Sequence, residues 1–513
     1  MKSSQEALRQ LDESPLSSFH FKTVLTSGMG FFTDAYDLFV IGVVSTILKN
    51  VWHISTLDIS LLSSTALLSA ALGAIIFGRI ADRFGRKFVY GYELIVLAIG
   101  AIASAFSPNV LWLLFFRFVL GLGVGGDYPV SATLMSEYSN RYDRGKLITL
   151  VFSTQALGLI VGPLLTVLLL VSGVNQDLTW RVLLGVGAIP ALATFWLRRQ
   201  IAESPRFALA HGNVKEAEQA VQMVVQGRRD GVKCDKIHQQ LTDGSLEKIN
   251  PAIKLAADGD GVRVHPGQTV SARTLFTTRH LLKWLIGAAG TWFLLDVSYY
   301  GTTVSTPLVI KLFSPQTTLV QNMLYTLLIF VVAALPGYIV AALTIDRLGR
   351  KRIQLLGFAM MTVAYGTLFL FPALTQIAWT FLLIYGLSYF FTEFGPNVTT
   401  FVLPAEIFPV EARTTAHGIS AAVGKVGAFI GAFLFPLLLS NPTFRLPLRA
   451  CRITLEKFII WPKEQVLLPF EFRPQRCNHF LCQPMCNSFG IRRTQIQDDM
   501  RCSFGDIRTH TIE

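Results

Sequence analysis

The composition of this 513-residue chain excludes a water-soluble protein. Hydrophobic residues make up 51% of the chain, charged residues make up only 15%, and the mean hydropathy is +0.47, whereas soluble domains carry about 25% charged residues. The formal net charge of +12 is typical of basic loops beside anionic lipid, so it requires no nucleic-acid partner.

Eleven mainly apolar segments are each long enough to cross a membrane as a helix, which takes about 20 residues. They lie near residues 21–48, 57–80, 88–106, 110–138, 146–173, 181–198, 281–303, 318–344, 353–373, 376–403 and 411–440. No cleavable signal peptide is expected, because the residues before the first segment are polar and lack an apolar h-region. We therefore expect an all-α, polytopic membrane protein.

Short basic loops indicate the orientation of these segments. Lys and Arg residues gather at 79–87, 141–146 and 347–352, between spans two and three, four and five, and eight and nine. The positive-inside rule places all three loops in the cytoplasm. The amino terminus and the long central loop are then cytoplasmic too.

A polar stretch between spans six and seven divides the chain. It contains no apolar segment able to span a membrane, so it is typical of a linker with a short surface helix. We expect a six-helix bundle over residues 1–200, a cytoplasmic linker over 201–279, a bundle of five spans over 280–440 and an atypical tail over 441–513.

Two signatures recur in the same order in both halves. The loop 82–87 reads DRFGRK and the loop 346–351 reads DRLGRK. In each half a glutamate then precedes an arginine by seven residues, at Glu137 and Arg144 and again at Glu406 and Arg413. Chance does not explain two ordered repeats, so we infer an internal duplication of a six-span unit.

These repeated loops resemble those of the major facilitator superfamily. The stretch 203–206, ESPR, just after span six also resembles a motif of its sugar-porter branch. The resemblance covers about residues 20–440. It implies two pseudo-symmetric helical bundles around a central substrate site that opens alternately to either side of the membrane.

A glycine-rich run, GLGVGG at 121–126, matches the G-x-G-x-x-G spacing of dinucleotide-binding folds. That motif must follow a strand and open a helix, whereas this run continues an apolar segment that already begins near Leu111. Small residues at such density let helices pack closely in lipid. We expect helix packing here, and also at Gly427 and Gly431.

Several ionisable residues lie within the apolar spans, where each costs at least about 2.5–3.5 kcal/mol. They are Asp34, Asp37, Glu93, Arg117, Asp127, Asp296, Glu393 and Lys425. The structural alternative for each is a pair inside the bundle or a side chain that reaches the membrane surface from a helix end. The central positions of Asp127 and Asp296 favour a function.

Longer strings resemble the plant and fungal phosphate:proton symporters of this superfamily. They are GGDYPVSATLMSE at 125–137, FGPNVTTF at 394–401 and TAHG at 415–418. The resemblance implies a phosphate site made of Tyr128, Gln155, Trp292, Asp296, Tyr300 and Asn397. It also implies proton coupling through Asp34, Asp37, Arg117 and Asp127, with Lys425 near the anion.

The implied function is proton-coupled import of inorganic phosphate across the plasma membrane by alternating access. Phosphate and protons are the expected partners, besides membrane lipid. The alternatives are a sugar or organic-anion carrier, which the stretch 203–206 suggests, and a non-transporting phosphate sensor or inactive truncated isoform. An enzyme is not expected, because no Walker A motif and no catalytic or metal cluster occurs in the spans; no cofactor is expected either.

The residue chemistry fits an anion site with a carboxylate in it. Trp292, Asp296 and Tyr300 are spaced i, i+4 and i+8, so they share one helix face. An ionised Asp296 can accept a hydrogen bond from dihydrogen phosphate, but it would repel an oxyanion without protons. A packed aromatic stripe is the structural alternative for Trp292 and Tyr300.

Arg117 lies about three helical turns before Asp127, so the two residues share a helix but are too far apart for direct contact. We expect Arg117 to pair with Asp37 of the first span, and protonation of Asp37 to release it and bias the conformational equilibrium. The structural alternative is a permanent ion pair.

After Ser440 the sequence departs from the family, because basic residues interrupt every apolar window and no twelfth span is predicted. We hypothesise that alternative splicing, a retained intron or a frameshift replaces that span and leaves a less stable transporter with its site residues intact. Four residues are zinc-ligand types without the spacing of a zinc site, so no metal is expected, and disulfides are the alternative on the outer side. They are Cys477, His479, Cys482 and Cys486.

Overall fold

The computed structural model describes residues 9–226, 273–314, 316–371, 373–374 and 377–440. All of them fall in the first of two compact units, Met1–Trp461, and the second unit, Pro462–Glu513, lies outside them. The predictions for the tail 441–513, including its zinc, disulfide and splicing hypotheses, and for most of the linker 201–279 therefore concern residues outside this description.

Regular structure in the described residues is entirely helical. The first half contains α2 (Ser18–Val51), α3 (Thr56–Phe84), α4 (Arg86–Val89), α5 (Tyr92–Ala105), α6 (Val110–Tyr138), α7 (Arg144–Ser153), α8 (Gln155–Val171), α9 (Gln176–Val186), α10 (Ala188–Arg198), α11 (Pro205–Ala210) and α12 (Val214–Gln226). The glycine run 121–126 lies inside α6 with no strand before it, so the dinucleotide-fold alternative is wrong.

The second half begins after the linker. It contains α15 (Thr274–Thr277), α16 (Arg279–Val304), α17 (Thr306–Phe313), α18 (Leu319–Ile329), η2 (Phe330–Ala334), α19 (Leu335–Leu348), α20 (Arg350–Leu370), α21 (Ala378–Thr392), η4 (Glu393–Asn397), α22 (Val398–Ile407), η5 (Val410–Ala412) and α23 (Arg413–Ser440). The segments η2 and η4 are π-helical and η5 is a 3-10 helix.

Ten helical stretches among the described residues are long and apolar enough to cross a membrane. The difference from the eleven expected spans lies at 376–403, where α21 and α22 are separated by the π-helical η4. Gly395 inside η4 has non-helical angles (φ −105°, ψ −106°), and Pro396 follows it. Proline removes a backbone donor, so a Gly-Pro pair interrupts the helix that the apolar pattern predicts.

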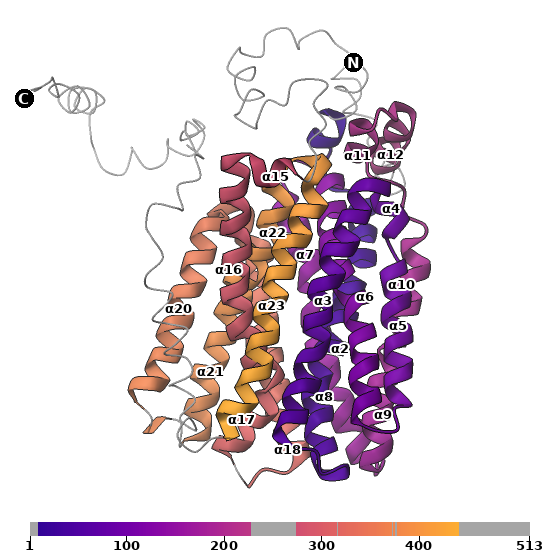
Figure 1. Cartoon of the computed structure of the whole chain (residues 1–513). Helices are drawn as coiled ribbons and strands as arrows, with labels where there is room; N and C mark the ends of the chain where they lie inside the picture. Colours follow the sequence, from indigo (N-terminus) through magenta and orange to yellow (C-terminus); the bar gives the residue numbers. More distant parts are fainter. Residues whose placement is uncertain (1–8, 227–272, 315, 372, 375–376, 441–513) are drawn as a thin grey trace, which may run out of the picture. The chain divides into compact units, whose positions relative to one another are not determined.

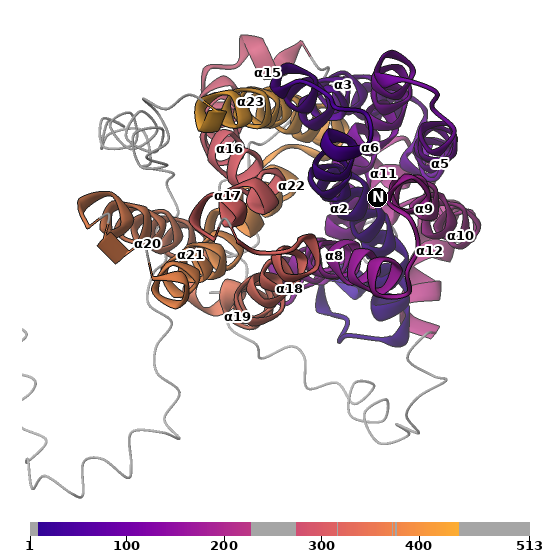
Figure 2. The ribbon, with the colours of Figure 1, turned by 90° about the horizontal axis from the view of Figure 1, so that it is seen from below.

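The two halves lie side by side (Figure 1), and their helices are in contact along two outer seams as well as in the middle of the bundle. Seen from below, α23 of the second half lies beside α3, and α18 and α19 lie beside α8 (Figure 2). Small residues allow the close approach at the first seam, because a Cβ atom on Gly418 of α23 would lie 2.4 Å from the backbone oxygen of Ala74 in α3.

Glycines also bring helices together within each half. In α6, a Cβ atom at Gly121 would lie 2.1 Å from the oxygen of Ala66, and one at Gly125 would lie 1.9 Å from the oxygen of Ala70. In α23, Gly427 and Gly431 meet the backbone of α16 in the same way. The predicted packing role of these glycines is therefore confirmed.

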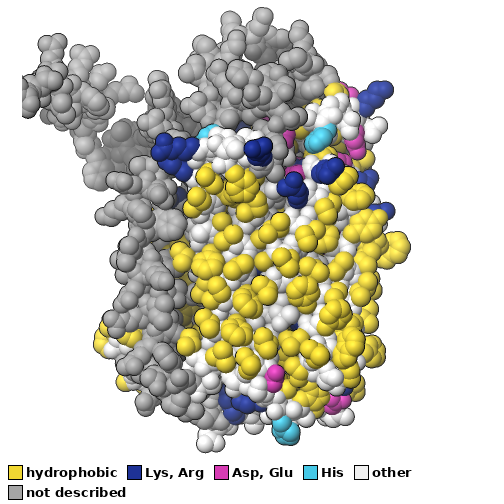
Figure 3. Space-filling view, viewed as in Figure 1, with side chains coloured by type: hydrophobic (Ala, Val, Ile, Leu, Met, Phe, Trp, Pro, Cys, Tyr) yellow, Lys and Arg dark blue, Asp and Glu magenta, His cyan; other side chains and the backbone are white. Residues whose placement is uncertain are grey.

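Hydrophobic side chains cover most of the lateral face that Figure 3 presents, with Lys and Arg side chains near both ends of the bundle. Trp112, Trp196 and Trp379 are among the exposed large hydrophobic side chains of the described residues (49%, 69% and 68% exposed). Such a surface suits hydrocarbon with polar borders. The helix α12, at the start of the linker, is packed against the bundle: its Val221 and Val224 belong to a buried cluster with Leu11, Ala81 and Tyr138.

The repeated sequence loops fold alike at one end of the bundle, which we call the basic end. Gly85 (φ 100°) and Gly349 (φ 83°) end α3 and α19 in a conformation that favours glycine. The arginine after each glycine then joins two carboxylates. Arg86 lies 3.2 Å from Asp82 and 3.0 Å from Glu137, and Arg350 lies 2.8 Å from Asp346 and 2.6 Å from Glu406.

The aspartate of each repeated loop also binds the other half. Asp82 accepts hydrogen bonds from the backbone N–H groups of Thr414 (3.3 Å) and Thr415 (2.5 Å) at the start of α23. Asp346 accepts one from Lys146 (2.7 Å) at the start of α7. A carboxylate at a helix amino terminus satisfies free N–H groups and the helix dipole, so both contacts hold the basic end closed.

Packing at Gly125 gives a direct test of the seam between α3 and α6. We expect Gly125→Ala to lower the free energy of unfolding by about 1–3 kcal/mol, because the new methyl group must displace the backbone of α3. The matched control is Gly287→Ala in α16, where a Cβ atom would meet no atom within 4 Å. It should be neutral or stabilise by up to about 1 kcal/mol. Equal melting temperatures of the two purified variants would refute this account.

Candidate functional site

The six residues expected to form the phosphate site are all buried, none more than 4% exposed. They come from both halves: Tyr128 from α6, Gln155 from the start of α8, Trp292, Asp296 and Tyr300 from α16, and Asn397 from η4. The structure arranges five of them in two polar groups, one around Lys425 and one around Tyr338. The sixth, Trp292, lies beside the first group, with its ring centre 6.2 Å from that of Tyr128.

The first group, the Lys425 cluster, consists of Lys425, Asp296, Tyr300 and Tyr128. The Lys425 ammonium donates to the Tyr300 hydroxyl (2.7 Å) and to Asp296 Oδ2 (3.3 Å). It also lies 4.3 Å from the ring centres of both Tyr128 and Tyr300, a cation–π distance. The two tyrosine hydroxyls are 3.3 Å apart, so this contact joins α6 to α16.

The second group, the Tyr338 chain, consists of Gln155, Tyr338, Asn397 and Glu393. The Tyr338 hydroxyl donates to Gln155 Oε1 (2.9 Å), and the Asn397 amide donates to the Tyr338 hydroxyl (2.9 Å) and to Glu393 Oε2 (2.5 Å). Tyr338 belongs to α19 and Gln155 to α8, so this chain also crosses between the halves. Tyr338 belongs to none of the sequence motifs, so its place in this chain was not predicted.

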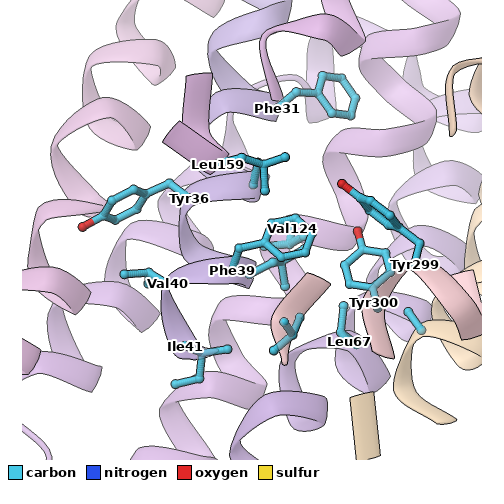
Figure 4. Packing of buried hydrophobic residues seen from close by; sticks show 14 of the residues in the cluster. Phe31, Tyr36, Phe39, Val40, Ile41, Leu67, Val124, Leu159, Tyr299 and Tyr300 are labelled. Atoms are coloured by element: carbon cyan, nitrogen blue, oxygen red, sulfur yellow. The ribbon is translucent and has the colours of Figure 1, made fainter. Parts of the chain in front are cut away.

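Aromatic side chains fill the space beside these groups. Phe401 contacts Tyr128 and Trp292, with ring centres 6.4 Å apart in both cases, and it stacks on Phe152 at 4.4 Å. Phe39 stacks on Tyr300 with centres 5.4 Å apart (Figure 4). Tyr300 therefore packs against an aromatic ring and also forms hydrogen bonds. The structural alternative of a packed aromatic stripe describes only part of its environment.

The aspartates of α2, Asp34 and Asp37, are fully buried. Among the described residues, no group forms a hydrogen bond with the carboxylate oxygens of either one. Asp34 is within electrostatic range of Asp127, Arg198 and Lys425. Asp37 is within electrostatic range of Arg117. Each acid is thus close to a charged group without a hydrogen bond to it.

Arg117 contacts Asp37 through a different atom from the one predicted. Its Nη2 donates to the backbone oxygen of Asp37 at 2.8 Å, and no ion pair joins the two side chains within 4.0 Å. The Asp37 carboxylate instead lies against α9 and α10, where a Cβ atom at Gly187 would be 2.3 Å from Oδ1. The expected ion pair is therefore wrong, although the two helices do meet at these residues.

Asp127 pairs with an arginine that the sequence analysis missed. Arg198, at the end of α10, lies 2.7 Å from Asp127 Oδ1 and 2.9 Å from Oδ2, and it also lies 2.7 Å from Glu93. Ser131 donates to the same Asp127 carboxylate. Asp127 is thus linked to Arg198 and Glu93 inside the first half, and Arg117 is not its partner. Glu93 follows its structural alternative, a pair within the bundle.

The arrangement defines a class of protein. Two helical halves that repeat one another and meet around buried polar side chains are the architecture of a secondary membrane transporter. Residues 22–450 match the model of the family described as "Sugar (and other) transporter". The chain belongs to this family of the major facilitator superfamily, as its sequence motifs predicted.

Relatives that are more than 30% identical to this chain include plant proteins. Inorganic phosphate transporter 1-11 of Oryza sativa subsp. japonica is 36% identical over 478 residues, which cover 83% of this chain and 81% of the relative. Low affinity inorganic phosphate transporter 1 of Petunia hybrida is 34% identical over 482 residues, covering 84% and 85%. The predicted resemblance is thus confirmed.

Solved structures agree on the fold. The partially occluded inward open xylose transporter XylE from E. coli superposes with a TM-score of 0.66 at 19% identity, covering 87% of this chain and 98% of that one. The same transporter bound to 6-bromo-6-deoxy-D-glucose gives 0.65 at 20% identity, covering 87% and 96%. The major facilitator fold predicted from sequence is therefore confirmed.

The ion pairs of Arg198 predict a large effect on stability. Arg198→Ala leaves two buried carboxylates without a cation, so we expect a loss of about 3–5 kcal/mol in the free energy of unfolding. Adding Asp127→Asn and Glu93→Gln to that variant removes both charges and should restore part of the loss. The control is Arg9→Ala, which breaks an exposed pair with Glu13 and should cost about 1 kcal/mol or less. A similar melting temperature for Arg198→Ala and Arg9→Ala would contradict the prediction.

Proposed function

We propose that this protein imports inorganic phosphate together with protons across the plasma membrane by alternating access. The names of its plant relatives support phosphate as the substrate. The observation that carries the proposal is the buried ion pair between Lys425 and Asp296, 3.3 Å apart, with the hydroxyls of Tyr128 and Tyr300 beside it.

Charge balance links the anion to a proton. Lys425 and an ionised Asp296 together carry no net charge, so a phosphate monoanion that joins them leaves one buried negative charge. An unbalanced charge in a medium of low dielectric constant is costly. A proton taken up by Asp296 removes that excess, and loss of this proton on the cytoplasmic side helps to expel phosphate.

The carboxylate also favours one kind of anion. Before Asp296 takes up its proton, the ionised carboxylate can accept from the hydroxyl groups of an arriving dihydrogen phosphate, whereas an oxyanion without protons has only acceptors to present to it. Tyr128, Tyr300 and the Trp292 indole supply donors around the same point. Gln155 and Asn397 would contact the anion from the Tyr338 chain.

We assign the remaining expected residues to proton transfer. Asp34 and Asp37 lie on α2 without a bonded cation among the described residues, so each can take a proton without first breaking an ion pair. Arg117 acts by its contact with the Asp37 backbone. Asp127 acts through Arg198, because a change in that ion pair would alter the electrostatic field at Asp34.

The alternating step requires the basic end to open. Asp82 must leave the start of α23, and Asp346 must leave the start of α7. At the opposite end α2 meets α16, where a Cβ atom on Gly42 would lie 2.1 Å from the oxygen of Val304. We infer that the two closures are released in turn.

A sugar or organic-anion carrier is the alternative within the family. The stretch that suggested it has a structural use here, because Glu203 accepts from the backbone N–H groups of Arg86 (3.2 Å) and Lys87 (3.0 Å). Burial raises the pKa of the Glu203 carboxyl, and the N–H groups of Ser204 and Lys87 oppose that rise. The stretch 203–206 therefore stabilises the basic end, and it does not favour a sugar over phosphate as the substrate.

Phosphate uptake by the purified full chain in liposomes tests the proposal. An inward proton gradient should drive accumulation, with competition by arsenate but not by sulfate or xylose. Asp296→Asn should lower gradient-driven uptake at least about tenfold, because a hydrogen bond to a charged group contributes about 1.5–3 kcal/mol. Asp177→Asn, at an exposed aspartate, is the matched control and should transport normally.

Two outcomes would overturn the assignment. Uptake by Asp296→Asn with the same pH response as the parent chain would remove Asp296 from coupling. Phosphate binding without any flux in the parent chain would favour the sensor or inactive-isoform alternative.

A further inference from the structure

Glu393 is a buried acid that the proposed transport cycle leaves without a role. It begins η4 and is 0% exposed. Three other buried acids of the described residues form an ion pair: Asp127 with Arg198, Glu137 with Arg86 and Asp296 with Lys425. No ion pair joins Glu393 to a basic side chain of the described residues, and the side chains that act on it are the neutral ones of Asn397, Tyr338 and Tyr299.

The contacts of Glu393 lead to the phosphate site. Its Oε2 accepts the Asn397 amide at 2.5 Å, and the same amide donates to Tyr338 at 2.9 Å. Its Oε1 has no hydrogen-bond partner in the described part of the chain, nor does the hydroxyl of Tyr299, which interacts electrostatically with this carboxylate. One carboxylate oxygen is therefore engaged and the other is free to hold a proton.

The helices packed around Glu393 present mostly neutral groups to it. Tyr299 of α16, Tyr338 of α19 and Tyr389 of α21 are the titratable side chains that act on it or respond to it. The helix α20 approaches η4 through Gly357, where a Cβ atom would lie 2.4 Å from Pro396. The charged residue of α22, Glu406, is paired with Arg350. A lone carboxylate in such surroundings costs less to bury with a proton than without one.

We propose that Glu393 takes up a proton when phosphate binds and thereby positions Asn397 and Tyr338 for the anion. An ionised Glu393 holds the Asn397 amide as a charged acceptor. A protonated Glu393 holds it more weakly, so the amide and the Tyr338 hydroxyl turn to the phosphate oxygens. Glu393 is a positioning residue in this scheme, and the inference rests on the proposed phosphate function.

The linkage follows from competition between two anions. Phosphate and the Glu393 carboxylate are both acceptors, and both require the donors of the Tyr338 chain. A proton on Glu393 removes one competitor and its negative charge, so protonation strengthens phosphate binding, and phosphate binding strengthens protonation equally. The π-helical turn η4 suits this role, because such turns occur frequently at functional sites.

Equilibrium binding of labelled inorganic phosphate to the purified full chain, measured against pH, tests this inference without requiring transport. In the parent chain the Kd should rise with pH. In Glu393→Gln, whose amide oxygen still accepts from Asn397 but cannot titrate, the rise should be less steep by up to about tenfold per pH unit. Titration of phosphate itself and of Asp296 is common to both chains, so the difference isolates Glu393.

Three further variants separate positioning from a general loss of structure. Glu393→Asp can still titrate and should restore the steep pH dependence. Tyr338→Phe loses one donor and should weaken binding about two- to tenfold at every pH, with the slope unchanged. Glu216→Gln replaces an exposed glutamate of α12 and should match the parent.

A Glu393→Gln chain that keeps the full slope of the parent would overturn the inference and leave the phosphate function standing. Should that chain not fold, Asn397→Ser cuts the same link from the other side, and a full slope in it would be equally decisive against the inference. No phosphate binding by the folded parent chain would overturn the proposed function and this inference together.

Discussion

The cost of a charge between apolar helices governs this molecule. A buried carboxylate is stabilised either by a cation within bonding distance or by a proton. Arg198 supplies the cation for Asp127 and Glu93, and Lys425 supplies it for Asp296. The described residues offer no cation within bonding distance to Asp34, Asp37 and Glu393, and we propose that protons stabilise these acids instead. The first kind of site holds helices together, and the second kind can respond to a proton gradient.

The ion pairs at the basic end show how the duplicated sequence becomes a duplicated closure. In each half one arginine joins an aspartate and a glutamate, and that aspartate also binds the start of a helix from the other half. Neither half can leave this arrangement without exposing helix N–H groups and a carboxylate. In the proposed opening of this end both sets of contacts would be exposed to solvent, so water could replace them there, which it could not do in the middle of the bundle.

Features that depend on the local pattern of residues, such as the spans and the buried face of α16, could be predicted from the sequence. Features that depend on the direction in which a side chain points could not. Apolar length predicted the spans, and helical period placed Trp292, Asp296 and Tyr300 on one buried face. Arg198 was missed because an arginine at the end of an apolar segment usually reaches the membrane surface, whereas here it turns inward. The direction of the Asp37 carboxylate and the break at Gly395 depend on tertiary packing that hydropathy does not contain.

Tyrosine hydroxyls carry the polar contacts between the halves near the middle of the bundle. Tyr128 meets Tyr300 at 3.3 Å, and Gln155 accepts from Tyr338 at 2.9 Å. These neutral bonds are each worth only about 1 kcal/mol net, so they hold the halves in register without locking them. In the proposed binding mode an anion with four oxygens would take over both contacts, since each involves a group able to donate to it. Substrate would then replace the bonds that join the halves, and so the site and the moving interface would be the same surface.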